Sequence, residues 1–186
     1  MSAGTAANVT TGKRRVDGGI YIAPANTTLP TDAKTTLANT FVNVGYISED
    51  GATNSRNRTV QDIKEWGGAT VDSSTTEFKN EWKFKMIESL NINALKLCFG
   101  DSNVTEASDK ITTKINADEL DERVVVIDMA VKGNKLKRVV IPRGKITAIG
   151  DTVYKGSEAV AFDVTLSTYA NASGDYQYEY IEAAAT

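Results

Sequence analysis

The segment TEFKNEWKFKM, residues 76–86, constrains the fold of this chain more than any other. Its large apolar side chains fall on alternate positions from 78 to 86, with Asn80 as the only polar residue among them. The apolar members are Phe78, Trp82, Phe84 and Met86, and the charged members of the other face are Glu77, Lys79, Glu81, Lys83 and Lys85. This alternation predicts a half-buried strand in an antiparallel sheet, whose mixed-charge wet face discourages stray edge pairing.

Other extended segments follow at short intervals along the chain. Residues 123–131, RVVVIDMAV, are β-branched and apolar on both faces, as expected of a central strand. Residues 132–135 supply a hairpin turn, and Pro142 marks a point where ladder pairing must stop or bulge. The remaining expected strands are residues 19–23, 40–48, 66–71, 110–116, 136–142, 144–149, 159–168 and 176–181.

One helix is expected, over residues 88–99. Apolar residues around it follow a helical stripe, and Gly100 is a natural stop. The stripe consists of Ile87, Leu90, Ala94, Leu97 and Cys98. Many short strands, one helix and no alternation of strands with helices predict a mainly β fold, an antiparallel β-sandwich or barrel with one flanking α-helix.

The composition argues against most catalytic chemistry. The chain has 186 residues, no histidine and one cysteine, which removes histidine bases and nearly every zinc site with nitrogen or sulfur ligands. Cys98 lies in an apolar run and is expected to be a small buried hydrophobe. Asp128, inside an apolar strand, is expected at a bulge or in a hydrogen bond rather than as a functional carboxylate. We therefore predict no catalytic residue, no cofactor and no metal, and the chain is not expected to be an enzyme.

Charge and hydropathy limit the classes of partner that the chain is expected to have. The net charge of −3 and the absence of a long basic run do not favour a protein that grips nucleic acid. No segment is apolar enough for a signal peptide or a membrane span. We expect the chain to be made and to mature in a cytoplasm.

The predicted organisation is an N-terminal arm, residues 1–17, a β-domain, residues 18–181, and a short C-terminal tail, residues 182–186. Within the domain, the polar residues 53–65 are expected to form a projecting loop that carries subunit contacts, because its two apolar side chains cannot be buried on its own domain. A solvent-exposed flexible loop is the alternative. The candidate interface residues are Lys13, Arg14, Arg15, Arg56, Arg58, Val60, Ile63 and Lys64.

Several segments, in order and spacing, resemble the major tail tube proteins of long-tailed, non-contractile bacteriophages. The most distinctive is VGYISEDG followed by Trp-Gly-Gly, and the next is FKMIESLN with LKLCFG. The others are GGIYIAPANTTLPTDA, FVNVGYISEDGATNS, QDIKEWGG, ERVVVIDMAVKGNKLKRVVIPRGKI and EAVAFDVTLSTY. Together they cover most of residues 18–169.

The resemblance implies a structural subunit that polymerises into stacked, hexameric rings around a tape-measure protein. It also implies tail terminator and tail tip proteins as partners, double-stranded DNA passing through the lumen without sequence-specific binding, and a place in the virion tail after assembly in the host bacterial cytoplasm. In the family, arms and a long hairpin bridge adjacent rings.

Two other functions remain open at this point. A carbohydrate-binding or other ligand-binding sandwich would use Tyr176, Tyr178 and Tyr180 as an exposed platform, although a core-facing or inter-subunit stripe is the favoured reading. The other alternative is the tube protein of a contractile injection system, which is closer in kind to the tail tube of a non-contractile phage.

Overall fold

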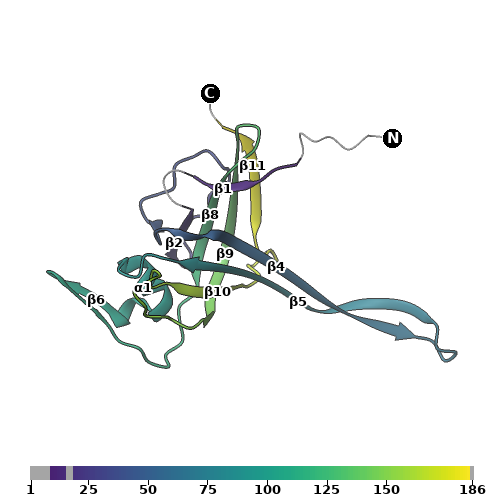
Figure 1. The fold of residues 1–186 in the computed structure, drawn as a ribbon. Coiled ribbons are helices and arrows are strands. Elements are labelled where there is room, and N and C mark those ends of the chain that lie inside the picture. The colour runs from purple at the N-terminus through teal and green to yellow at the C-terminus, as the bar shows by residue number, and fades with distance from the viewer. Residues whose placement is uncertain (1–8, 16–18, 185–186) are drawn as a thin grey trace.

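The computed structural model describes residues 9–15 and 19–184 (Figure 1). It is mainly β, with antiparallel strands and one α-helix, α1 (Ile92–Phe99), followed by the short 3-10 turn η2 (Asp101–Asn103). The strands are β1 (Gly12–Arg14), β2 (Ile20–Pro24), β3 (Val42–Asn43), β4 (Ile47–Lys64), β5 (Thr70–Met86), β6 (Val104–Ala107), β7 (Lys110–Thr113), β8 (Arg123–Val131), β9 (Lys135–Ile149), β10 (Phe162–Thr168) and β11 (Tyr178–Ala183). The predicted fold class is confirmed.

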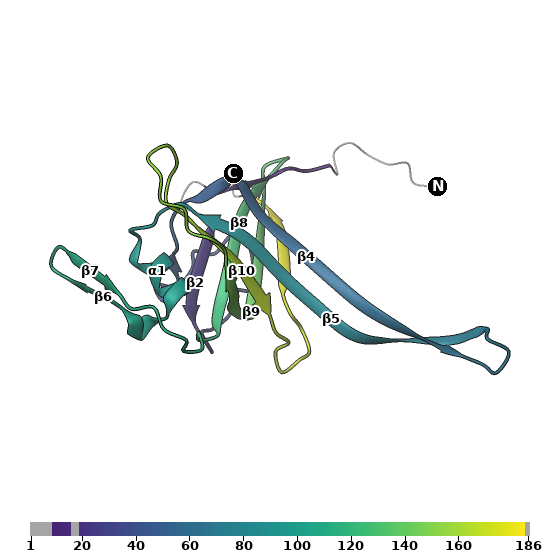
Figure 2. The same ribbon diagram turned by 60° about the horizontal axis from the view of Figure 1, so that its bottom comes forward.

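Nine of these strands form one sheet in the order β3-β2-β8-β9-β10-β5-β4. Strand β1 also pairs with β8, and β11 also pairs with β9. Strands β6 and β7 form a separate hairpin beside α1 (Figures 1 and 2). The sheet curls so that β5, β10 and β9 share one core with α1.

Strand β8 is buried on both faces, as its sequence predicts. Val125 and Ile127 join a large core with Trp82, Phe84 and the buried face of α1. Val124 and Val126 face the other way, into a smaller cluster covered by the segment between β2 and β3 and by β11. A strand without a wet face has no alternation, which explains its continuous apolar run.

Helix α1 begins four residues later than predicted. The Asn91 side chain caps it by accepting hydrogen bonds from the Asn93 and Ala94 amides. Glu88 is drawn away from the helix, because its carboxylate accepts a hydrogen bond from the Tyr46 amide at 2.7 Å. Leu90, counted in the predicted stripe, is 81% exposed. The predicted stop at Gly100 is confirmed, with φ at +91°.

Strand β9 is one strand where the sequence predicts two. Val125 pairs with Ile141 and Arg123 with Gly144, so β9 carries one extra residue at this position. The bulge takes in Pro142, which cannot donate to the ladder, and the strand continues beyond it. Of the two outcomes expected at Pro142, the bulge is correct.

The C-terminal tail is shorter than predicted. Strand β11 extends to Ala183, and the Glu182 carboxylate accepts a hydrogen bond from the Ala33 amide at 3.2 Å. Residues 182 and 183 therefore belong to the domain, because they pair with the start of β9. Residues 185–186 lie outside the described part of the chain.

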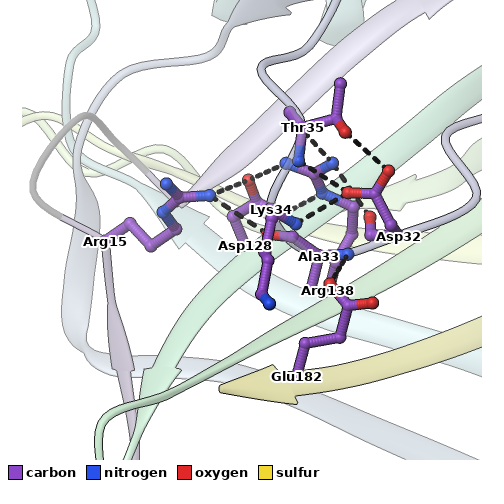
Figure 3. A network of polar contacts seen from close by, with 8 residues as sticks. All are labelled: Arg15, Asp32, Ala33, Lys34, Thr35, Asp128, Arg138 and Glu182. Carbon is purple, nitrogen blue, oxygen red and sulfur yellow. Dashed lines mark hydrogen bonds and ion pairs between the residues drawn. The ribbon is translucent and has the colours of Figure 1, made fainter. Parts of the chain in front are cut away.

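Asp128 forms a buried ion pair, so the prediction of a hydrogen-bonded partner is correct. Arg138 donates to it from Nε at 2.7 Å and from Nη2 at 2.8 Å (Figure 3). The Nη1 group of Arg138 donates to the carbonyls of Asp32 and Thr35 at 3.0 and 2.9 Å. The pair thereby fastens the segment between β2 and β3 onto β8 and β9.

Candidate assembly interface

The most prominent surface feature is the long β4–β5 hairpin, which extends well beyond the body (Figures 1 and 2). Residues 53–64, expected as a loop, are strand: β4 pairs with β5 from Ala52 opposite Phe84 to Lys64 opposite Thr70. The prediction of a loop is wrong because both faces are wet beyond the core, so the sequence lacks the alternation that marks a strand. Register shifts after Thr59 and Ile63 interrupt this outer ladder.

The Trp-Gly-Gly motif closes the hairpin. The Gly68 amide donates to the Glu65 carbonyl, and the Glu65 amide to the Ala69 carbonyl, both at 2.9 Å. Gly68 has φ at +90°, a conformation that glycine adopts without strain. Residues 66–68, predicted as extended, are therefore a turn. The turn places Trp66 at the far end of the molecule.

The outer part of the hairpin, residues 60–71, is called the hairpin tip below. Its four large apolar side chains are all exposed: Val60 51%, Ile63 50%, Trp66 105% and Val71 62%. None of them lies within either core cluster. Four exposed apolar side chains on one projecting segment make it a candidate interaction site, and tryptophan is among the residues enriched at binding hot spots.

The base of the hairpin is braced against β11. Arg56 of β4 forms an ion pair with Glu179, Nη2 to Oε1 at 2.6 Å, and Lys137 of β9 holds the other carboxylate oxygen at 2.7 Å. Gln177 donates to Glu179 at 2.8 Å and accepts from Trp82 at 3.0 Å. This network links four strands, β4, β5, β9 and β11, at the point where the hairpin leaves the body.

Aromatic contacts continue the brace outward. The rings of Phe78 and Tyr176 meet edge to face, with centroids 4.9 Å apart. The guanidinium of Arg58 lies 5.2 Å from the centre of the Phe78 ring, at cation–π distance. Arg56 and Arg58 thus contact other strands of the same chain at the base, whereas Val60, Ile63 and Lys64 lie in the exposed tip. The candidate residues divide into two groups that the sequence could not distinguish.

The electrostatics of the base favour a charged Glu179. Burial raises the pKa of this carboxyl. The hydrogen bonds and positive charges of Lys137 and Arg56 lower the pKa, and together they outweigh the effect of burial. The net pKa lies below the ordinary value. Glu179 is therefore ionised at neutral pH and holds both cations.

The candidates of the arm are only partly described. Lys13 and Arg14 belong to β1, which pairs with the end of β8, and Lys13 is exposed. Arg15 lies against Asp128, with Nη1 to Oδ2 at 3.4 Å, and so joins the network of Figure 3. Residues 1–8 and 16–17 of the predicted arm lie outside the described part of the chain.

The three tyrosines of the C-terminal segment make internal contacts. Tyr176 meets Phe78, and the Tyr178 hydroxyl donates to Asp175 at 2.8 Å and accepts from Asn171 at 2.8 Å. Tyr178 and Tyr180 pack against the smaller core cluster. These contacts support the core-facing reading of the tyrosine stripe.

Over residues 9–15 and 19–184, no helix is long and apolar enough to cross a bilayer. In the same residues, no group of three or more potential metal-ligating side chains comes together. The distinguishing feature of the described surface is the projecting apolar tip on its braced base, an arrangement typical of a protein that associates with other protein chains.

Comparison with known families identifies which structural protein this is. The family described as "Phage tail tube protein" matches residues 10–186, and the chain belongs to that family. Its members are structural and not enzymatic, and they assemble with copies of themselves in the tail of the virion. No curated protein matched the chain.

Proposed function

We propose that this chain is the repeating subunit of a tail tube built from stacked, six-membered rings, and that the tube conducts double-stranded DNA into the host. Family membership supports a tail tube subunit. The ring symmetry, the role as a DNA conduit and the non-contractile tail are proposed from the sequence resemblance to tail tube proteins of non-contractile phages. The tube protein of a contractile injection system is the alternative.

The single observation that carries the proposal is the exposed hairpin tip on a braced base. Four large apolar side chains project into water at the end of a hairpin that has its own rigid attachment. Burying one such side chain contributes about 1.5–3 kcal/mol, so a second subunit is the natural place for the tip. In this proposal residues 53–65 carry the contacts between rings, and each subunit repeats them.

The passage of DNA requires a lumen that does not hold it. A net charge of −3 suits weak repulsion of phosphate, and the family resemblance supplies the tape-measure, terminator and tip proteins as the partners that set the length and ends of the tube. Assembly would take place in the host bacterial cytoplasm.

The proposal is tested by concentrating the purified chain and following it by light scattering and negative-stain electron microscopy. We expect stacked rings with an open lumen, and a six-fold average in end views. Monomers at every concentration and salt condition, together with absence of the chain from virions, would overturn it. Binding of a monomer to a glycan array would favour the carbohydrate-binding alternative.

A further inference from the structure

We propose that residues 32–35 form a clasp that couples the first and last strands of the described chain, β1 and β11, so that docking of one strand on the body stabilises docking of the other. The clasp lies in the segment between β2 and β3 and contacts a side chain from each end of the described residues (Figure 3). The inference concerns the single subunit and goes beyond the proposed function, on which it does not depend.

One residue of the clasp is held from both sides. The Ala33 amide donates to the Glu182 carboxylate of β11 at 3.2 Å. The Ala33 carbonyl accepts from Nη1 of Arg15, the residue directly after β1, at 3.5 Å. Ala33 is 1% exposed, so either backbone group would be buried without a partner if the side chain that binds it withdrew. The first and last strands therefore share a single point of attachment.

The clasp is also fixed to the middle of the sheet. Arg138 of β9 donates to the carbonyls of Asp32 and Thr35, and its other nitrogens bind Asp128 of β8. The Asp32 carboxylate accepts from the amide and the hydroxyl of Thr35 at 2.6 and 2.7 Å, which holds the bend of the clasp. A continuous hydrogen-bond network of this kind is a physical route by which two sites are coupled.

The two end strands flank the same hairpin but are held unequally. Strand β1 pairs with β8 over three positions, and β11 pairs with β9 over six. The contacts of Arg15 are long, 3.4 Å to Asp128 and 3.5 Å to the Ala33 carbonyl, and its side chain is 28% exposed. Strand β1 is therefore the more easily released of the two, and Arg15 is its link to the clasp.

Apolar packing ties the clasp segment to β11 but not to β1. Leu29 and Leu37, which flank the clasp in sequence, pack against the smaller core cluster, as does Tyr180 of β11. Strand β1 has the sequence Gly-Lys-Arg and brings no apolar side chain to this cluster. Coupling of β1 to the clasp therefore depends on the polar contacts of Arg15.

The cost of an unsatisfied buried group supplies the coupling. When β1 leaves β8, the Ala33 carbonyl loses its donor and Asp128 loses one of the two guanidinium groups that contact it. The clasp then lowers its free energy by moving toward water, and this movement breaks the bond between Ala33 and Glu182. Linkage makes the effect reciprocal, so a second chain that binds either strand favours release of the other.

Amide hydrogen exchange of the purified subunit tests the coupling. Arg15→Ala should speed exchange in β11 by about fivefold or more, the lower end of the usual range for coupled sites. Lys13→Ala is the matched control, because it removes an exposed cation from β1 and leaves the clasp intact. The β6–β7 hairpin forms a separate sheet, so its local opening keeps the clasp closed and its exchange should match the wild type in both variants.

The reciprocal variants are made on β11. Glu182→Ala should speed exchange in β1, whereas Glu182→Gln keeps an acceptor for the Ala33 amide and should exchange at the wild-type rate. Unchanged exchange of β11 in Arg15→Ala, or an equal rise in the β6–β7 hairpin, would overturn the proposal. It would also fail if Glu182→Gln behaved like Glu182→Ala.

A double-mutant cycle measures the coupling from global unfolding. Arg15→Ala combined with Glu182→Ala should cost less stability than the two single changes summed, because either change alone already loosens the clasp. Lys13→Ala combined with Glu182→Ala should be additive. Additive losses in the first cycle would contradict the proposal.

Discussion

Arg56 of β4 and Glu179 of β11 form an ion pair of 2.6 Å across the base of the long hairpin, although 123 positions separate them in sequence. Lys137 of β9 binds the same carboxylate. The hairpin therefore leaves the body through a four-strand junction. A projecting element with a fixed direction can present its tip to another subunit at lower entropic cost than a mobile loop can.

Arg56→Ala should loosen the base without unfolding the domain. Arg56 is 53% exposed, so its ion pair contributes no more than about 1 kcal/mol to the free energy of unfolding. The expected result is a small loss of stability with faster amide exchange in the outer residues of β4 and β5. Lys79→Ala, which removes an exposed pair with Glu77, is the control. Equal exchange in both variants would contradict the bracing role.

Glu179 should make stability depend on pH in the acid range. Its pKa is lowered in the folded state, so the unfolded chain takes up the proton first as the pH falls. Its stabilising contribution is complete above the ordinary pKa of 4.5 and is lost as the pH falls through the lower folded value. Denaturant titrations of the wild type and Glu179→Gln should differ at pH 7, and the difference should shrink as the pH falls below 4.5. A difference that persists in acid would count against this account.

The Asp128–Arg138 pair should be much more costly to break. Both side chains are almost fully buried, at 5% and 1% exposed. Burial lowers the pKa of Arg138, but the hydrogen bonds and charge of Asp128 outweigh this, so its pKa lies above its ordinary value. Asp128→Ala leaves a buried cation without its partner and should cost about 3–5 kcal/mol.

Thermal and denaturant unfolding measure the loss. Asp163→Ala, on the exposed face of β10, is the matched control and should change stability by less than about 0.5 kcal/mol. Similar losses in the two variants would show that the buried pair does not hold the segment between β2 and β3.

Cys98 should be unreactive in the folded protein. Burial raises the pKa of this thiol to about 12, so almost no thiolate exists at neutral pH. An aromatic disulfide reagent at pH 8 should modify it only as fast as the chain opens, and at once in denaturant. Rapid modification of the native protein would contradict the burial of α1 against the sheet.

The core strands were predictable from the sequence because burial leaves a pattern of apolar residues, alternating when one face is buried and continuous when both are. The alternation of β5 from Phe78 to Met86 and the apolar run of β8 both appear as predicted strands. The strand character of the outer hairpin was not predictable, because a strand exposed to water on both faces has no alternation of apolar and polar residues. Its strand character comes from pairing between β4 and β5, which a linear pattern does not reveal.

The projecting segment was predictable from the sequence, but the exposure of its individual residues was not. Val60 and Ile63 attracted notice because they are apolar within a polar run, and both lie in the exposed tip. Trp66 was not among the candidates because tryptophan usually signals a core position, and its exposure depends on the turn at Gly68. Arg56 and Arg58 were grouped with the tip because their partners, Glu179 and Phe78, lie on other strands.

The most direct test of ring stacking through the hairpin is to shorten it in register. Thr59 lies opposite Glu77, so residues 60–76 can be replaced by Asn-Gly, a two-residue hairpin turn. Circular dichroism and thermal unfolding should match the wild type, since no buried side chain is removed. Under conditions in which the wild type forms tubes, electron microscopy of the shortened protein should show no stacked rings. Tubes of normal length and spacing would contradict the account.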